Sequence, residues 1–285
     1  MITILGTGLL GSGFARALLK NGETVRVWNR TGSRAQALVE HGAVAVADAA
    51  EAVRGADRVH VVLADDVAVD SVLEAASAGF AAGMLVVDHS TTSPGGALAR
   101  TKRWRERGIT YLHAPVFMGP RNAIDGTGFM LLSGDRELVA RVTPMLAPMT
   151  GKLLDLGPRV DQAAAFKLIG NLLLFSLGAA FSDIIALAAS MGIGAKEAGT
   201  LFDQFNPGAQ LVARYKRFTD AAYDDVSWDL AMARKDARLM QAEADRAGIE
   251  LRLLPPLAAK MDEMIGRGFA ERDWTVVGTD LLKPG

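Results

Sequence analysis

A lysine inside a strongly apolar stretch is the residue that this sequence places best for proton transfer, and an asparagine accompanies it. Lys167 and Asn171 lie four positions apart, so in a helix they occupy the same face. A lysine among apolar residues must be paired, extend into water, or have a lowered pKa, and a lowered pKa suits a general acid or base near neutral pH. The pattern indicates acid–base catalysis by Lys167, with an amine that extends into solvent as the alternative.

Glycines near the start of the chain predict a dinucleotide-binding turn. An apolar run at 1–5 leads into Gly6, Gly8 and Gly11 and then into a helical pattern over 9–21. The first glycine allows the tight turn, the second lets the backbone approach a pyrophosphate, and the third permits close packing of helix on strand. Unpaired N–H groups at the helix N-terminus face the phosphates. The expected cofactor contacts are Gly6, Gly8, Leu9, Leu10 and Gly11. A glycine-rich turn without a ligand is the alternative.

The end of the second apolar run, 24–28, indicates which dinucleotide binds. Enzymes that use NAD usually place an acidic residue there, where its carboxylate holds the ribose 2′-hydroxyl. This chain has Arg30 instead, with Arg34 close behind. A guanidinium can bind a 2′-phosphate through two parallel charge-assisted hydrogen bonds, so the sequence predicts NADP(H) as the cofactor. The residues expected around that phosphate are Asn29, Arg30, Thr31 and Arg34. A solvated surface arginine is the alternative.

Short apolar runs alternate with helical stretches up to about residue 160, which predicts an α/β fold with a doubly wound parallel sheet of the Rossmann type. The predicted strands are 1–5, 24–28, 43–46, 58–63, 84–88, 110–112 and 129–133. The predicted helices between them are 9–21, 33–41, 49–54, 67–79 and 94–107. Ligands bind beyond the carboxyl ends of such strands. We therefore expect three loops at the cofactor: 6–11, 64–66 with Ala64 and Asp65, and 89–92.

The remainder of the chain predicts an all-helical C-terminal domain over 161–285, for substrate binding and dimerisation, after an NADP-binding domain over 1–160. The predicted helices are 161–191, 195–205, 209–216, 228–247 and 255–267. The first is about 45 Å long, and its segment 168–189 is apolar enough to resemble a membrane span. Because that segment contains Asn171 and Asp183, we expect it to join the domains and to bury its other faces in a homodimer rather than in a membrane.

Bulk composition argues against several classes of function. The 285 residues include 31 basic and 32 acidic ones, with no basic stripe of the kind that binds nucleic acid. The chain has no cysteine, and its four histidines lack the spacing of metal ligands. It begins without a pattern typical of an export signal. We therefore expect a cytoplasmic protein that acts on a small molecule without a metal ion.

Together these motifs resemble those of the β-hydroxyacid dehydrogenase family, which includes 3-hydroxyisobutyrate dehydrogenases and glyoxylate/succinic semialdehyde reductases. The likeness covers essentially the whole chain. Its signatures stand here as Gly6-Thr-Gly-Leu-Leu-Gly11, Asp88-His-Ser-Thr-Thr-Ser-Pro94, His113-Ala-Pro-Val-Phe-Met-Gly119 followed by Gly126-Thr127, Asp161-Gln-Ala-Ala-Ala-Phe-Lys167-Leu-Ile-Gly-Asn171, and Lys235-Asp236.

The resemblance implies a role for four of these side chains. Lys167 would be the catalytic acid/base, and Asn171 would help to hold the substrate. Thr91 would line the nicotinamide site, and Lys235 would lie near cofactor and substrate. On its pattern alone, the Lys235–Asp236 pair is typical of a surface ion pair.

The substrate motif departs from the family where a carboxylate would be gripped. Phe117 and Met118, ahead of Gly119, stand where the family has a serine and a glycine, and Gly170 replaces the first asparagine of the lysine motif. A phenyl ring in place of a hydroxyl removes a donor for an anion and adds apolar surface. The residues expected at the substrate are Phe117, Met118 and Gly119. They predict a substrate more apolar than a small hydroxy acid.

The sequence therefore predicts an NADP(H)-dependent oxidoreductase that transfers a hydride between the nicotinamide and a small carbonyl or hydroxy compound. The apolar motif also resembles that of imine reductases and reductive aminases, which reduce apolar C=N bonds but commonly carry Asp or Tyr at the position of Lys167. A nucleotide-binding homologue without catalysis is a third possibility, which intact Lys167, Asn171 and Thr91 disfavour.

Overall fold

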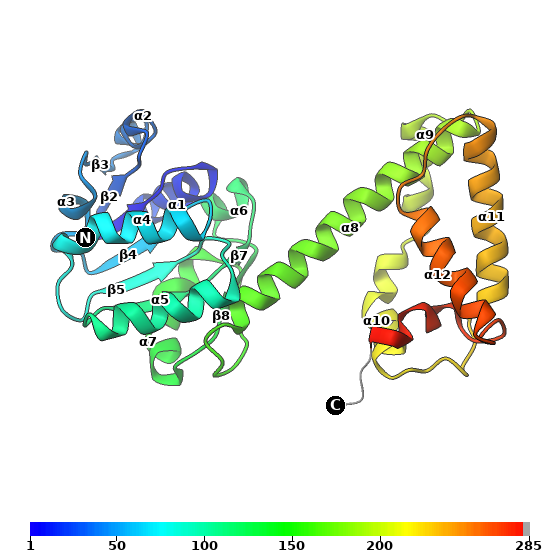
Figure 1. Cartoon of the computed structure of the whole chain (residues 1–285). Coiled ribbons are helices and arrows are strands. Elements are labelled where there is room, and N and C mark those ends of the chain that lie inside the picture. Colours follow the sequence, from blue (N-terminus) through cyan, green and yellow to red (C-terminus); the bar gives the residue numbers. More distant parts are fainter. Residues whose placement is uncertain (282–285) are drawn as a thin grey trace. The chain divides into compact units, whose positions relative to one another are not determined.

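The computed structural model describes residues 1–281, and its contacts divide the chain into two compact units. The first unit comprises Met1–Leu172, and the second begins at Leu173. The division lies inside one long helix, α8 (Gln162–Ser190), whereas the sequence predicts a boundary between residues 160 and 161. The named strands all belong to the first unit (Figure 1).

A six-stranded parallel sheet forms the centre of the first unit. Its strand order is β3-β2-β1-β4-β5-β6, and every neighbouring pair is parallel. The strands are β1 (Ile2–Leu5), β2 (Val25–Trp28), β3 (Val44–Ala45), β4 (Arg58–Val61), β5 (Leu85–Asp88) and β6 (Thr110–His113). The connecting helices are α1 (Leu9–Lys20), α2 (Gly32–Gln36), α3 (Ala49–Val53), α4 (Asp66–Ala76) and α5 (Pro94–Glu106). The predicted doubly wound α/β fold is confirmed. The strand order reverses beside β1, where such sheets bind ligands.

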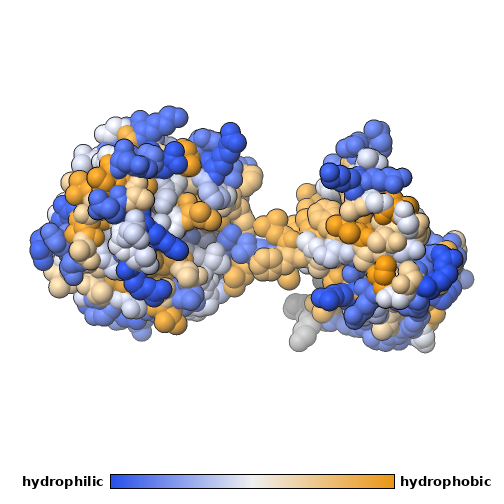
Figure 2. All heavy atoms as spheres, turned by 90° about the horizontal axis from the view of Figure 1, so that it is seen from above, coloured by the Kyte–Doolittle hydropathy of each residue, from blue (hydrophilic) through white to orange (hydrophobic). Residues whose placement is uncertain are grey.

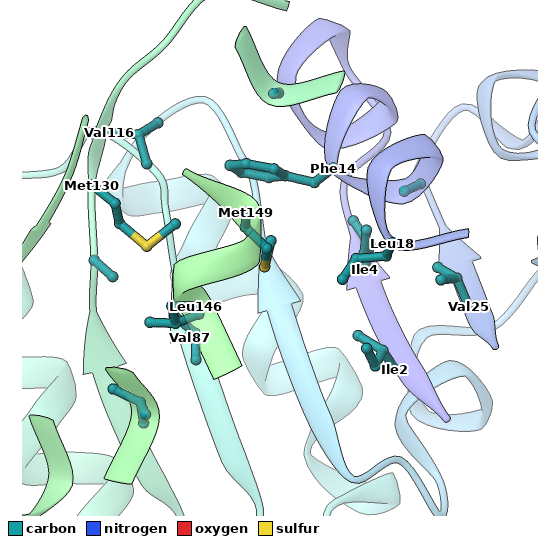
Figure 3. Close-up of a cluster of buried hydrophobic side chains, with 14 of the residues drawn as sticks. Ile2, Ile4, Phe14, Leu18, Val25, Val87, Val116, Met130, Leu146 and Met149 are labelled. Atoms are coloured by element: carbon teal, nitrogen blue, oxygen red, sulfur yellow. The ribbon is translucent and has the colours of Figure 1, made fainter. Parts of the chain in front are cut away.

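Buried apolar side chains hold helices against both faces of this sheet. Strands β1 and β5 are buried along their whole length, as expected where helices cover both faces. On one face Ile4 of β1 belongs to a cluster with Phe14 of α1 that extends to Met130 (Figure 3). On the other face Leu73 of α4 and Trp104 of α5 belong to a second cluster. These two clusters fix the strand ends from which the loops of the site emerge.

The segment after β6 forms a separate three-stranded sheet, which corrects one prediction. Strand β7 (Val116–Phe117) pairs antiparallel with β8 (Phe129–Leu132), and β8 pairs in parallel with β9 (Lys152–Asp155). The predicted strand 129–133 exists, but its expected place in the parallel sheet is wrong. The chain leaves the main sheet after His113, and the carbonyl oxygen of Pro115 already accepts the backbone N–H of Leu131 in β8 at 2.9 Å.

Two further helices flank β8, α6 (Pro120–Asp125) and α7 (Arg136–Leu146), and the sequence analysis did not predict them. The Asp135 carboxylate caps α7 by accepting the backbone N–H of Leu138 at 2.8 Å. This helix also contains Pro144 in its last turn, which weakens the helical pattern in the sequence.

The second unit is helical, as predicted, and α8 forms over nearly the whole expected range. The other helices are α9 (Ala195–Gly199), α10 (Leu211–Thr219), α11 (Leu230–Arg246) and α12 (Leu254–Gly266). The predicted helix 195–205 is wrong beyond Gly199, where the chain continues as a 3-10 helix over Thr200–Asp203. A further 3-10 segment over Trp274–Leu281 was not predicted.

The carboxylate of Asp183 explains one charged residue within the apolar helix α8. Its two oxygens accept backbone N–H groups from Arg252 and Leu253, each at 2.9 Å. These donors immediately precede the first turn of α12, so Asp183 stabilises the start of that helix from a neighbouring element.

Most of α8 exposes apolar side chains within this single chain. By length and composition alone the helix could cross a membrane, with a mean hydropathy of 2.1 over the most apolar window, of which 6% is buried. Exposed side chains on it include Phe175, Phe181 and Ile185, and its surface is largely hydrophobic in Figure 2. Many apolar side chains of α8 are therefore exposed within this chain.

Buried histidines form a chain of hydrogen bonds at the ends of β4, β5 and β6. Arg58 Nε donates to His60 Nε2 over 3.1 Å, and His60 Nδ1 lies 2.9 Å from His89 Nε2. His89 Nδ1 lies 2.8 Å from the carbonyl oxygen of Ala114. An arginine only donates and a carbonyl only accepts, so both rings are neutral and carry the proton on Nδ1. Burial lowers the pKa of His60 well below its usual range and that of His89 to about 4.

We expect the free energy of unfolding to fall as the pH is lowered from about 6.5 towards 4. In this window an unfolded histidine binds a proton that buried His60 and His89 do not bind, so protons are taken up on unfolding. Each such histidine contributes up to about 1.4 kcal/mol per pH unit. Urea unfolding of His60→Gln should show a shallower pH dependence, and the exposed control His41→Gln should keep the original one. Equal slopes for all three proteins would contradict this account.

Candidate active site

A cleft of about 900 Å³ opens beyond the carboxyl ends of the parallel strands, within the first unit. Its walls bring together residues that the sequence analysis assigned to cofactor, substrate and catalysis. These are Gly8, Leu9, Leu10, Asn29, Arg30, Thr31, Arg34, Ala64, Asp65, Thr91, Met118 and Lys167. The three predicted loops therefore meet around one hollow, in the position where doubly wound sheets bind ligands.

The glycine turn is shaped to receive a pyrophosphate. Gly6 has a φ of +101°, and a Cβ on Gly11 would lie 2.0 Å from the Gly6 carbonyl oxygen, so neither position accepts a side chain without a shift. Helix α1 begins at Leu9. Its N-cap residue, Gly8, has no side chain that could accept a hydrogen bond from the N–H groups of the first turn. The Thr7 hydroxyl in this turn is buried and has no hydrogen-bond partner among residues 1–281. These free donors fit a dinucleotide phosphate.

Asn29 joins this turn to the end of β2. Its Oδ1 accepts the backbone N–H of Thr7, and its Nδ2 donates to the carbonyl of Thr31, each over 3.0 Å. Beside it, Arg30 and Arg34 line the cleft, and neither pairs with a carboxylate in the described part of the chain. Two guanidinium groups without acidic partners at this end make it suitable for an anion.

Asp88, at the end of β5, is fully buried and anchors the loop that follows it. One carboxylate oxygen accepts the backbone N–H of Ser90 at 2.9 Å, and the other accepts the hydroxyl of Tyr111 at 2.5 Å. Burial and the nearby Asp88 raise the pKa of Tyr111 well above its usual range, which keeps this hydroxyl a donor. His113 Nε2 lies 2.9 Å from the Ser90 carbonyl oxygen. Ser90 is thus held on both sides, and Thr91 beside it lines the cleft.

Arg100 connects this loop to its neighbour. The side chain is 1% exposed, its Nε donates to Tyr111 Oη over 3.1 Å, and its Nη2 donates to Asp66 Oδ1 over 2.7 Å. Asp66 also accepts the backbone N–H of Ser93 at 2.9 Å. Because Asp66 begins α4 directly after Asp65, the loops that carry Asp65 and Thr91 are tied together beneath the cleft.

Lys167 reaches the cleft from the early turns of α8. Its Nζ lies 4.3 Å from the ring centroid of Phe117, and no carboxylate pairs with it within residues 1–281. Burial lowers the pKa of Lys167. The start of the helix is fixed because Ser133 Oγ accepts the backbone N–H of Ala163 at 2.9 Å. The amine therefore lies at the cleft with the properties that a general acid or base requires.

The structure places the other predicted site residues less directly. Asn171 lies one turn beyond Lys167 on α8. Gly119 is the N-cap residue before α6, and its N–H donates to Asn122 Oδ1 over 2.9 Å. Lys235 belongs to α11 in the second unit and pairs with Asp236 at 2.9 Å. Its role at the cofactor stays a prediction. Among residues 1–281 no group of three or more His, Cys, Asp or Glu side chains is arranged to hold a metal ion.

One wall of the cleft was missed by the sequence analysis. It consists of side chains on α4, namely Val67, Ala68, Ser71, Val72 and Ala75. Trp28, Val62, Leu63 and Val116 also line the cleft, whereas His89 and Ser90 belong to the predicted loop 89–92. The α4 residues recur at helical spacing directly after the predicted loop at 64–66. That spacing was the available signal, because a helix that starts at a ligand loop turns one face toward the ligand.

The fold and the cleft are those of a dinucleotide-binding protein, and similarity to known enzymes identifies the chain as an oxidoreductase that depends on a pyridine nucleotide. The chain belongs to the family whose model is described as the NAD binding domain of 6-phosphogluconate dehydrogenase, which matches residues 1–157.

Known proteins are similar over nearly the whole chain. Glyoxylate/succinic semialdehyde reductase 2 of Arabidopsis thaliana, a chloroplastic protein, is 29% identical over 97% of this chain and 78% of its own length. The NAD-dependent L-serine dehydrogenase of Pseudomonas aeruginosa is 30% identical over 97% and 96%. A reductive aminase from Aspergillus terreus, solved with NADPH and ethyl levulinate, is 26% identical, has a TM-score of 0.88 and covers 99% of both chains. The resemblance to hydroxyacid dehydrogenases, with features of imine reductases, is thereby confirmed.

Proposed function

We propose that this protein is an NADPH-dependent reductase of small, neutral, apolar carbonyl compounds. The observation that carries the proposal is the Lys167 amine, which lies at the dinucleotide cleft without a carboxylate partner in residues 1–281 and 4.3 Å from a phenyl ring. Oxidation of the corresponding alcohol uses the same groups in reverse.

The chain's own contribution is a positioned proton. A bound nicotinamide supplies the hydride that adds to the carbonyl carbon. The ammonium of Lys167 donates a proton from Nζ to the carbonyl oxygen as negative charge develops there, and the neutral amine then regains a proton from water. Since burial lowers the pKa of Lys167, its two protonation states lie closer in free energy near neutral pH. Asn171, one turn away, is suited to orient the substrate oxygen.

Phe117 and Met118 support an apolar substrate. Phe117 contacts the Lys167 amine and Met118 lines the same cleft, and neither side chain has a donor for a carboxylate. A substrate carboxylate buried there without partners would cost several kcal/mol, whereas an apolar group would gain from leaving water.

Imine reduction is the second candidate. The phenyl ring and the similarity to a reductive aminase favour it. The lysine favours the carbonyl reaction, because its proton suits an oxygen that becomes a hydroxyl. A role in nucleotide binding without catalysis is the third candidate, and NADPH turnover with any of these compounds would exclude it.

Replacement of Lys167 by alanine should lower kcat for carbonyl reduction by about 10²- to 10⁴-fold, the usual contribution of a general acid, while NADPH affinity stays close to that of the parent. NADPH consumption should be followed with succinic semialdehyde, glyoxylate, apolar aldehydes and ketones, and a cyclic imine. Lys20→Ala, an exposed lysine at the end of α1, is the matched control and should keep its kcat. If Lys167→Ala retains most activity, the lysine is not the acid. Turnover of imines alone would favour the second candidate.

The choice of NADPH rests on Arg30 and Arg34 at the end of β2. The L-serine dehydrogenase relative is described as NAD-dependent, so relatives at this similarity do not share one evident cofactor. In this chain a 2′-phosphate would meet guanidinium groups, whereas a 2′-hydroxyl would meet no carboxylate from these two positions.

Arg30→Ala should raise the Kd of NADPH by about 10- to 100-fold, the loss expected for one or two charge-assisted hydrogen bonds, and change that of NADH little. Fluorescence titration of both cofactors measures the effect. Arg16→Ala, at an exposed position on α1, is the control. An equal loss for both cofactors would argue that Arg30 does not read the 2′-phosphate.

We also propose that a second copy of this chain covers the apolar surface of α8, as in the expected homodimer. Side chains such as Phe175, Phe181 and Ile185 are 72%, 48% and 49% exposed within one chain, and water around them is unfavourable. Lys167 lies on the same helix, so dimerisation would also stabilise the element that carries the proposed acid.

Sedimentation of the parent protein at micromolar concentration should give a dimer, and Phe175→Asp should weaken it. Arg103→Ala, on the exposed part of α5, is the control. A monomeric parent protein, or one that partitions into phosphatidylcholine vesicles, would contradict the homodimer.

A further inference from the structure

Phe117 and Gly170 are in contact, although the sequence separates them by more than fifty positions. Phe117 ends β7, and Gly170 lies in the early part of α8. A Cβ on Gly170 would lie 2.3 Å from Cζ of the Phe117 ring and 2.7 Å from Cε1. The ring edge therefore occupies the space of a side chain on the helix, and it fits because position 170 has none.

The face of the same ring is turned to Lys167. Its Nζ lies 4.3 Å from the ring centroid, within the range of a cation–π interaction. Lys167 precedes Gly170 by three positions, so one phenyl ring contacts two successive turns of α8 at once. In the described residues the ammonium has no carboxylate partner, so the ring is a charge-stabilising neighbour without a competing ion pair.

We propose that Phe117 and Gly170 form a matched pair in which the glycine admits the ring and the ring positions the Lys167 amine and favours its protonated form. Phe117 is then a positioning residue for the proton donor. The inference rests on the proposed function for its catalytic meaning, whereas the contact between ring and helix is independent of any activity.

The pair has two separable effects. The ring face attracts the ammonium, which opposes the lowering of the Lys167 pKa by burial. The ring edge also occupies the space of a side chain at position 170, so neither Phe117 nor Gly170 offers a side-chain hydrogen-bond donor beside Lys167. A neutral substrate needs no charge-assisted hydrogen bond at this place, whereas an anionic substrate would receive none from the side chains of this pair.

The contact can be tested without turnover by a double-mutant cycle of melting temperatures. In the Phe117→Ala background, Gly170→Ala should raise the melting temperature by a few degrees, because alanine is the better helix former. With Phe117 present, the new Cβ must displace the ring, so the same substitution should lower the melting temperature or leave it unimproved. Gly95→Ala, on α5 with no atom within 4 Å of its Cβ position, should give the same change in both backgrounds. Equal effects of Gly170→Ala in the two backgrounds would overturn the matched pair.

The pH dependence of kcat/KM tests the role of the ring face. Phe117→Leu keeps an apolar side chain but has no π face, so the pKa of Lys167 should fall. The alkaline limb of kcat/KM for reduction should then move to lower pH by about one unit. Met118→Leu changes the same apolar wall but keeps the ring, and it should leave the limb in place. The positioning role would be overturned if the alkaline limb of the kcat/KM profile of Phe117→Leu were unchanged or moved to higher pH. If no carbonyl compound is reduced by the parent protein, the proposed function fails while the melting-temperature cycle still decides the contact.

Discussion

The buried carboxylate of Asp88 is the constraint on which the cleft depends. A fully buried charge is costly unless hydrogen bonds satisfy it, and here Ser90 and Tyr111 donate to it from the loop it precedes and from the next strand. Arg100 then extends the network to Asp66 at the start of α4. Two loops that border the cleft are therefore fixed from below by the same buried charges. Asp88, Tyr111 and Arg100 are all buried, so removal of one of them would leave a buried polar group of its neighbour with one hydrogen bond fewer.

The two ends of the cleft differ in chemistry because different elements supply them. Near β2, guanidinium groups and backbone N–H groups offer charge and hydrogen bonds to a polar ligand. Near α8, a single amine lies over a phenyl ring, and a methionine lines the same cleft. An amine in apolar surroundings is sensitive to each neighbour, since the weak screening there strengthens every charge interaction. The ring of Phe117 is therefore placed where one side chain has a large influence on the proton donor.

Local patterns were sufficient to predict the parallel sheet, the glycine turn and the long helix, because each follows from spacing within a few turns or strands. The small sheet was not predictable in the same way. The apolar pattern of 129–133 predicts a strand, but nothing within that segment indicates that it pairs with β7 and β9 rather than with β6. The wall on α4 also escaped, since its residues are small and apolar and resemble an ordinary core face.

The departures at Phe117 and Gly170 show the limit of sequence reasoning most clearly. In the sequence they are two unrelated losses of polar groups. In the structure they are one contact, because the ring fills the space that the glycine leaves. Because this contact joins two residues that are far apart in the chain, no periodic spacing in a single sequence indicates it.

The hydrogen bonds of Asn29 have a consequence for the kinetics of ligand capture. They hold the glycine turn and the start of α2 in one arrangement before any ligand arrives. Little conformational entropy remains to be lost at this end on association, so docking of the nucleotide there need not await a loop rearrangement. The rate of capture would then be governed by diffusion and by the attraction of the two arginines for an anion, and would fall as ionic strength rises.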